Sequence, residues 1–456
     1  MLGLSLFFFS CTKMVQVDSP KNQIVTSQVF VDSINAAAAV SGIYAQLAYV
    51  STGIYFGNGA ITIYTGLSSD ELYPTSLNST DDLEFYTNSL SKDNSKNASF
   101  WSQAPGAYGM IYQTNACIEG LNKSLGINAS IRNQLVSECK VIRSFLYFNL
   151  VNLYGDIPFI VSTDYNVNKT LPRTSREIIY QNLISDLLEA QNQLLGNYFS
   201  AGRVRINKYA AMALLSRIYL YQKQWSQAED AASQIINSNI YALDSNLSNV
   251  FLAISKEAIW QLRPVQSGYE TAEGQKLIPS TAATALPGYG VSDYLINAFE
   301  LSDTRKTNWI AKKIVNNQTY SYPFKYKLRF DGAASPLEHY MIFRLAEQFL
   351  IRAEARAQQN KLPEAIADLN LIRKRAGLLG TVASSQPQII QAILHERQTE
   401  LFCEWGHRWY DLKRTNTIDG ILSAEKSPNW QSTDALYPIP NQELQLNPFL
   451  TQNPGY

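Results

Sequence analysis

Residues 209–238 read YAAMALLSRIYLYQKQWSQAEDAASQIINS, and this stretch decides the fold. Apolar residues recur at helical spacing on both sides of the short polar segment 222–225, so the pattern predicts two helices joined by a turn. Ser216 in the first helix and Ala228 in the second are small residues at positions where paired helices meet. The stretch therefore predicts two antiparallel helices that pack closely.

A second stretch has the same organisation. Residues 344–376 read RLAEQFLIRAEARAQQNKLPEAIADLNLIRKRA, with Ala353 and Ala365 at the small positions and Pro363 opening the second helix. Small and aromatic residues at these spacings are typical of tetratricopeptide repeats. The fold class predicted from both stretches is mainly α, built from helix pairs.

Further helices are predicted on the N-terminal side. Helical periodicity covers residues 32–49, 101–121 and 131–153. Thr174, followed by Glu177 three residues later, predicts a capping box that opens a further helix through residue 195. Residues 257–262, EAIWQL, predict one of a few short strands.

Two stretches rich in loop-forming residues interrupt this helical frame. Glycine, proline, serine and asparagine recur through residues 51–99 and again through 238–340. Loops positioned by a rigid frame commonly carry binding residues. These stretches therefore predict a loop-rich ligand-binding face.

Sugar binding requires aromatic rings that stack on the apolar side of a pyranose, together with polar side chains that bond its hydroxyls. Residues of these kinds in the two stretches are the predicted ligand-binding set: Asp70, Tyr73, Phe85, Tyr86, Tyr269, Tyr289, Tyr294 and Trp309. Core packing is the alternative for each aromatic residue among them. Trp101, at the start of a helix, and Trp260, in a strand, are assigned to the core.

The composition narrows the class of ligand. Lysine plus arginine and aspartate plus glutamate each number 38, so the formal net charge is zero. No stretch carries the clustered basic residues that nucleic-acid backbones require, which argues against nucleic acid. The chain holds 27 tyrosines, 19 phenylalanines and 7 tryptophans, a content that suits a neutral, hydroxylated ligand.

The N-terminus predicts secretion and lipid anchoring. Residues 1–10, MLGLSLFFFS, form an apolar run of signal-peptide length, too short to span a bilayer. Ser10 followed by Cys11 resembles a lipobox, which makes Cys11 the predicted lipidation residue and residues 11–30 the anchor and tether. A buried strand carrying an ordinary cysteine is the alternative.

No motif predicts a metal centre or a cofactor. His395 and Glu396 begin a zinc-protease motif, but Thr399 stands where the second histidine is required. The remaining cysteines, Cys117, Cys139 and Cys403, show no paired spacing and are predicted to be buried thiols.

A row of glutamates marks one helix face. Glu396, Glu400 and Glu404 recur every four residues near Arg397 and Arg408, which predicts an ion-paired structural helix. No phosphate-binding glycine loop and no nucleophile elbow is present. The chain is therefore predicted not to be an enzyme.

Several separate segments carry a family resemblance. They are NLYGDIP at 152–158, the strand 257–262, the helix 344–357, ERQTELF at 396–402, RWYDLKR at 408–414, YPIP at 437–440 and QNPGY at 452–456, together with the lipoprotein-like start. In their order along the chain they resemble the SusD/RagB outer-membrane nutrient-binding lipoproteins of Bacteroidota. The resemblance covers essentially the whole length.

The resemblance implies a single SusD-like domain over residues 31–456, with an N-terminal part at 31–240 and a C-terminal part at 241–456. It implies four tetratricopeptide-like helix pairs, a loop-rich ligand-binding face and minor β-strands. It also implies a SusC-like TonB-dependent transporter as partner, which such proteins cover as a lid while holding oligosaccharide or, in some members, peptide.

The hypothesis from sequence is a glycan-binding lipoprotein of the outer membrane that faces the cell exterior and delivers its ligand to the transporter. The alternative is a peptide- or protein-binding surface lipoprotein that uses the grooves between its helix pairs. A surface hydrolase is a third possibility, since Asp70, Glu71, Asp81, Asp82 and Asp303 are carboxylates of the type that glycosidases use.

Overall fold

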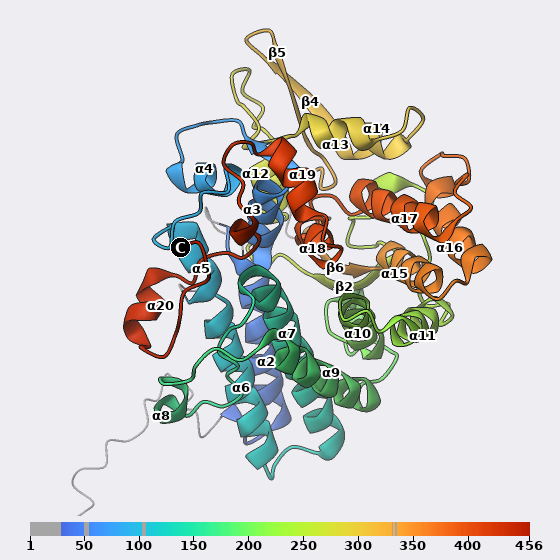
Figure 1. Ribbon diagram of the computed structural model, residues 1–456. Coiled ribbons are helices and arrows are strands. Elements are labelled where there is room, and N and C mark those ends of the chain that lie inside the picture. Colours follow the sequence, from blue (N-terminus) through green and yellow to red (C-terminus); the bar gives the residue numbers. More distant parts are fainter. Residues whose placement is uncertain (1–28, 50–53, 103–105, 331, 333–334) are drawn as a thin grey trace, which may run out of the picture.

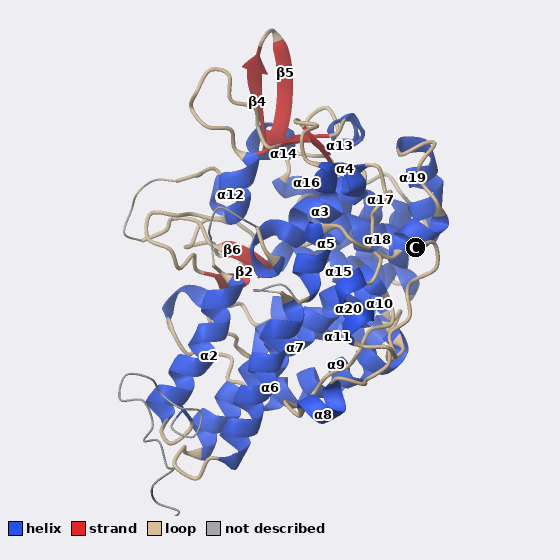
Figure 2. Ribbon diagram, turned by 90° about the vertical axis from the view of Figure 1, so that its left-hand side faces the viewer, coloured by secondary structure: helices blue, strands red, loops and turns tan. Residues whose placement is uncertain are grey.

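The computed structural model describes residues 29–49, 54–102, 106–330, 332 and 335–456 (Figure 1). The predicted lipidation residue Cys11 and the signal segment 1–10 lie outside these residues. Helices dominate the described chain, as predicted, and only short strands accompany them (Figure 2). No helix in the described ranges combines the length and the apolar character needed to cross a bilayer.

The predicted helix pairs are present and pack in succession along one side of the molecule (Figure 1). They are α7 (Ala129–Tyr154) with α9 (Arg176–Gln193), α10 (Lys208–Tyr221) with α11 (Trp225–Ile236), α15 (Leu345–Gln358) with α16 (Leu362–Arg375), and α17 (Gln386–Glu400) with α18 (His407–Arg414). Contacts of α9 with α10 and of α11 with α15 join neighbouring pairs.

The small residues singled out in the sequence lie where the helices meet. Ala228, Ala353, Ala365 and Ser216 are all fully buried. The Ser216 hydroxyl donates to the Gln348 side chain at 2.7 Å, which joins α10 to α15. Small side chains at these positions allow the close approach that the sequence predicted.

Two helix starts differ from the prediction. The helix expected over 101–121 begins only at Ala107, as α6 (Ala107–Lys123), and Trp101 is instead the last residue of α5 (Ser95–Trp101). The N-cap of α9 is Ser175, whose side chain accepts from the Ile178 amide, so the predicted Thr174 cap is wrong by one residue. Thr174 instead forms an antiparallel backbone bridge with Ile157, in which the Thr174 amide donates to the Ile157 carbonyl.

Three two-stranded antiparallel sheets lie within the described residues. They pair β1 (Leu72–Pro74) with β3 (Tyr289–Val291), β2 (Ala258–Leu262) with β6 (Tyr340–Arg344), and β4 (Ile310–Val315) with β5 (Gln318–Pro323). The predicted strand is confirmed as β2, and both it and β6 are buried along their whole length. The β4–β5 hairpin projects from the body of the molecule (Figure 2).

The remaining elements surround the helix pairs, and several of them pack directly on the pairs. They are α2 (Ser33–Leu47), η2 (Phe56–Ala60), α3 (Ile61–Ser68), α4 (Thr80–Tyr86), α8 (Tyr165–Asn168), η3 (Ala201–Arg203), η4 (Leu247–Asn249), α12 (Ala272–Leu277), α13 (Asp293–Ala298), α14 (Thr304–Trp309), α19 (Ile418–Glu425), η5 (Ser432–Ala435) and α20 (Asn441–Leu446). The two aromatic residues assigned to the core, Trp101 and Trp260, are buried.

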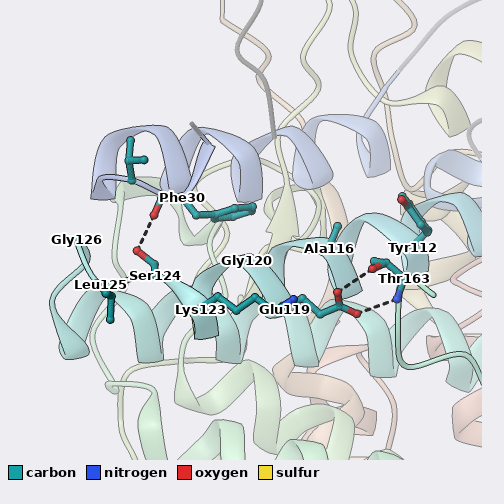
Figure 3. A pocket seen from close by; sticks show the side chains of 11 residues that line it. Phe30, Tyr112, Ala116, Glu119, Gly120, Lys123, Ser124, Leu125, Gly126 and Thr163 are labelled. Atoms are coloured by element: carbon teal, nitrogen blue, oxygen red, sulfur yellow. Dashed lines mark hydrogen bonds between the residues drawn. The ribbon is translucent and has the colours of Figure 1, made fainter. Parts of the chain in front are cut away.

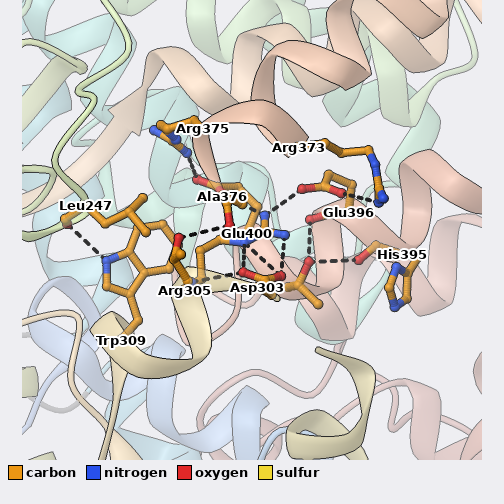
Figure 4. Close-up of polar contacts among 12 residues, drawn as sticks. Leu247, Asp303, Arg305, Trp309, Arg373, Arg375, Ala376, His395, Glu396 and Glu400 are labelled. Carbon is orange, nitrogen blue, oxygen red and sulfur yellow. Dashed lines mark hydrogen bonds and ion pairs between the residues drawn. The ribbon is translucent and has the colours of Figure 1, made fainter. Parts of the chain in front are cut away.

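The glutamate face of α17 is ion-paired, as predicted, through partners that the sequence did not show (Figure 4). Arg305 from α14 donates to Glu396 at 2.6 Å and to Glu400 at 3.0 Å, and it also bonds both oxygens of Asp303. Glu404, predicted on the same helix, lies beyond its end at Glu400, and Arg344 bonds both of its carboxylate oxygens at 2.8 Å. All of these side chains are buried, so the network fixes α14, β6 and α17 against one another.

Candidate functional site

Four of the predicted ligand-binding residues are buried in the structure. Phe85 and Trp309 have no exposed surface, and Tyr289 is 8% exposed with its hydroxyl bonded to Asp82. Asp70 is buried in an ion pair with Arg408, at 2.6 Å between Oδ2 and Nη2. None of the four can present a free face or a free carboxylate to a sugar.

Trp309 shows why the sequence was misleading at this position. Its indole nitrogen donates to the Leu247 carbonyl at 3.1 Å, and its ring lies beneath the Lys325 ammonium at 4.7 Å. Phe251 and Phe402 pack against the same ring. The partners come from distant parts of the chain, which a local pattern of loop residues does not reveal.

Three other predicted residues gather at the β1–β3 strand pair, and we call them the tyrosine surface: Tyr73, Tyr86 and Tyr294, all half-buried. Tyr73 is paired with Gly290 across the two strands, and any side chain at Gly290 would collide with the Tyr73 ring. Burial, followed by Tyr320, Asp293 and Tyr86, raises the pKa of Tyr73, which shows how close these groups lie. The structure thus joins the two predicted loop regions.

The last predicted residue, Tyr269, lies apart from this group. It forms a backbone bridge with Phe330, and the two rings pack edge to face at 5.3 Å. Phe330 covers one side of Tyr269 and is itself 57% exposed. Whether Tyr269 contacts ligand remains a prediction.

A cavity of about 440 Å³ between α2 and α6 combines the features that sugar binding requires. We call it the α2–α6 pocket. Its lining residues are Ala45, Gln46, Tyr49, Tyr55, Ser102, Gly106, Gly109, Met110, Gln113 and Val265. Tyr55 belongs to the first predicted loop region and Val265 to the second, so this pocket also lies where the two regions meet.

One buried side chain brings the two tyrosines of the pocket together. The Asn58 amide group donates to the Tyr49 carbonyl, and its oxygen accepts from the Tyr55 amide. The two aromatic rings lie 6.4 Å apart and are tilted by 40°. Asn58 is fully buried in η2, where the backbone leaves helical geometry at Asn58 (φ −137°) and at Gly59 (φ +103°).

A glycine next to Asn58 permits this arrangement. A side chain at Gly57 would lie 2.6 Å from the Leu47 carbonyl oxygen at the end of α2. Only glycine lets η2 approach α2 so closely. The sequence around residues 57–59 therefore fixes where Tyr49 and Tyr55 stand.

The chemistry of the α2–α6 pocket fits a neutral, hydroxylated ligand. Tyr49 is 45% exposed and offers a ring face, while Met110 and Ala45 supply apolar floor. Gln46 and Gln113 add amide groups that both donate and accept hydrogen bonds. Apolar walls with a few polar groups are typical of small-molecule sites.

A larger cavity, of about 600 Å³, lies at the opposite end of α6 and fits this purpose less well (Figure 3). Its inner polar groups are already paired, since Glu119 accepts from Thr163 and Ser124 donates to the Phe30 carbonyl. Tyr112 is its one tyrosine. It therefore lacks the paired aromatic rings of the α2–α6 pocket.

Tyr49 and Tyr55 are not among the predicted ligand-binding residues. The helix predicted over 32–49 includes Tyr49, whereas α2 stops at Leu47. Tyr55 lies within the first predicted loop region. The signal that could have found them is two tyrosines bracketing the start of a loop that contains the GNG sequence at 57–59.

Next to Asp70, the buried Glu71 carboxyl gives a prediction about pH. Burial, and then Asp70, raises the pKa of Glu71 to about 8, while its Oε1 accepts from the Cys403 amide. At a pH between 4.5, the ordinary pKa of glutamate, and about 8, Glu71 is ionised in the unfolded protein but keeps its proton in the folded protein. Stability from this group is complete below pH 4.5 and is lost as the pH rises toward 8.

Glu71→Gln should therefore flatten the dependence of unfolding free energy on pH by about 1 kcal/mol per pH unit between roughly pH 5 and 8. The amide oxygen can still accept from Cys403. Urea unfolding of both proteins at three pH values measures the difference. Parallel curves for the two proteins would contradict the assignment.

Comparison with known proteins agrees with this fold. Residues 293–456 match the SusD family, and residues 20–220 match a family described as starch-binding and associating with the outer membrane. A SusD-like protein, P25, from Formosa agariphila is 25% identical, over 98% of this chain and 97% of its own.

Solved structures have the same fold. A SusD superfamily protein from Bacteroides vulgatus superposes with a TM-score of 0.80 at 20% identity, over 94% of this chain and all of the other. Surface glycan-binding protein A from Bacteroides uniformis gives 0.78 at 20% identity, over 92% and 99%. On the two family matches and this fold, the chain belongs to the SusD/RagB family.

Proposed function

We propose that this protein is a cell-surface glycan-binding lipoprotein that captures oligosaccharide or polysaccharide and passes it to a SusC-like TonB-dependent transporter. The observation that carries the proposal is the α2–α6 pocket, where Tyr49 and Tyr55 stand side by side among amide groups. An aromatic ring can stack on the apolar face of a pyranose whatever its linkage. The pocket therefore suits an uncharged sugar.

The anchor is proposed from the sequence. Cleavage before Cys11 removes residues 1–10, and lipid on Cys11 with a tether to residue 30 holds the protein at the outer membrane, facing the exterior. The outer-membrane description of the family that matches residues 20–220 supports this location. Residues 31–456 then form the single ligand-binding domain.

Binding without turnover is part of the proposal. Two of the carboxylates of the type that glycosidases use are held in ion pairs, Asp70 with Arg408 and Asp303 with Arg305. Glu71 is buried. His395 bonds the Ala298 carbonyl at 2.8 Å and serves the packing of α13 on α17.

The test is affinity electrophoresis of the protein from residue 21 onward through gels containing plant, host and microbial polysaccharides. Tyr49→Ala should lower the polysaccharide affinity measured from retardation by roughly tenfold, because one aromatic contact with the ligand is removed. It should leave the melting temperature unchanged. Tyr112→Ala, at an exposed tyrosine of the other α6 cavity, is the matched control.

Other outcomes separate the alternatives. Retardation that survives Tyr49→Ala but is lost in Tyr73→Ala would move the site to the tyrosine surface. Free migration through every gel, with binding to peptides instead, would favour the peptide-binding alternative. Release of reducing sugar from any polysaccharide would overturn the assignment as a binding protein.

A further inference from the structure

A third cavity, of about 540 Å³, lies between the helix pairs and has a different chemistry. We call it the cationic cavity. It is bounded by the ends of α7, α10 and α18 and by the start of α9, and its lining includes Asn152, Arg176, Glu177, Tyr180, Tyr221, Lys223, Lys413 and Arg414. It shares no lining residue with the α2–α6 pocket.

Lys413 is the central charge of this cavity. Its ammonium donates to the Asn152 carbonyl at the end of α7, and no carboxylate pairs with it among the described residues. Burial, and then Arg176, lowers its pKa to about 7. An ammonium has three donors, and the bond to the Asn152 carbonyl uses one of them.

The neighbouring charges are also positive. Arg176 enters from the first turn of α9, and Lys223 from the turn after α10, where its φ is +56°. Arg414 is neutralised by Glu354 and Asp411 behind the cavity. Glu177 is the single acidic residue in the lining, and its exposed side chain bonds Arg176 at the surface.

A buried hydroxyl supplies the second observation. Tyr221 lines the cavity and is 9% exposed, yet its hydroxyl has no hydrogen-bond partner among the described residues. Leaving a buried hydroxyl unsatisfied costs about 1–3 kcal/mol. Tyr221 and Lys413 thus both line one cavity in which Glu177 is the single carboxylate.

We propose that the cationic cavity binds an oxyanion: the carboxylate, sulfate or phosphate group of a small solute or of a charged sugar. Lys413 and Tyr221 would donate to its oxygens from the inner wall. Arg176 and Lys223 would neutralise its charge at the rim. Charge-assisted hydrogen bonds of this kind are shorter and stronger than neutral ones.

The experiment is calorimetric titration of the folded protein with sodium sulfate at pH 6.5 in a constant chloride background. We expect saturable binding that weakens by roughly tenfold in Tyr221→Phe, since one hydrogen bond to a charged group is lost. Lys413→Met should abolish binding. Lys374→Met, at an exposed lysine on α16, is the control and should leave sulfate affinity unchanged.

A second variant distinguishes a structural role of Lys413 from a role in binding the oxyanion. If Lys413→Met unfolds because the Asn152 carbonyl loses its cap, Tyr221→Phe still tests the site, because it removes only a hydroxyl. Equal sulfate affinity in wild type and Tyr221→Phe, or no saturable binding in wild type, overturns the proposal. Titration with phosphate and with galacturonate then identifies which oxyanion source the cavity prefers.

The dependence of affinity on pH is a second readout. The oxyanion binds the protonated Lys413, so affinity should fall as the pH rises above about 7. The charged groups that line the cavity around this ammonium are Arg176, Glu177, Lys223 and Arg414. Burial raises the pKa of Tyr180 and of Tyr221, so neither hydroxyl ionises over this range. A flat profile between pH 6 and 8.5 would contradict the role given to Lys413.

Discussion

Trp309→Ala should lower the free energy of unfolding by about 3–5 kcal/mol, the usual cost of removing a large buried aromatic side chain. Trp309 has no exposed surface, and the change would open a cavity between Phe251, Phe402 and Lys325. It would also leave the Leu247 carbonyl without its indole donor. Urea unfolding followed by circular dichroism measures the loss.

Trp309→Ala also shows whether Trp309 serves the core or the ligand site. Glycan affinity per folded molecule should equal that of the wild type at a temperature where the variant remains folded. Leu379→Ala, at a side chain that is 88% exposed, should leave the unfolding midpoint unchanged and serves as the control. A stable Trp309→Ala protein that has lost only its glycan affinity would restore Trp309 to the ligand site.

Arg305→Met should destabilise the protein by about 3–5 kcal/mol, because it removes one partner of a buried ion-pair network. Arg305 is fully buried and bonds three carboxylates, those of Asp303, Glu396 and Glu400. Burial opposes ionisation of Glu400, and Arg375, Arg344 and Arg305 together hold its pKa below the usual range. Methionine fills much of the volume but supplies no charge.

The sign of the pH effect follows from that lowered pKa. A carboxylate whose folded pKa is depressed stabilises the protein above its unfolded pKa and loses this contribution as the pH falls. Arg305→Met should therefore be less destabilising at acidic pH, where the abandoned carboxylates accept protons. Thermal unfolding at pH 7 and pH 4 tests this difference.

Lys361→Met provides the matched control for Arg305→Met. Lys361 pairs with Glu229 at 2.6 Å, but its side chain is 46% exposed, so the pair is screened by water. The expected loss is below about 1 kcal/mol. Equal losses in the two variants would show that burial of the Arg305 network does not set its strength.

The sequence alone determined the helical frame. Periodic apolar residues and small residues at 216, 228, 353 and 365 predicted the packed pairs, because helix formation and close packing depend on residues only a few positions apart. The strand at 257–262 followed from the same short-range patterns, and the structure confirms it. The glutamates of α17 are ion-paired as predicted, but their partners include Arg305 and Arg344, whereas Arg397 and Arg408 bond Asp411 and Asp70.

The sequence also located the functional region correctly in outline. The α2–α6 pocket and the tyrosine surface both combine residues from the two predicted loop regions. Loop composition identifies such regions because irregular backbone needs glycine, proline and polar side chains. It does not say which aromatic ring in a loop turns inward.

Tertiary structure alone decided which side chains are exposed. Asp70 is buried because Arg408, far along the chain, pairs with it, and Trp309 is buried because Phe251 and Phe402 close over it. Tyr49 and Tyr55 form a pocket only because Asn58 holds both backbones and α6 packs beside them. Such burial depends on contacts between distant segments, and these arise only when the whole chain has folded.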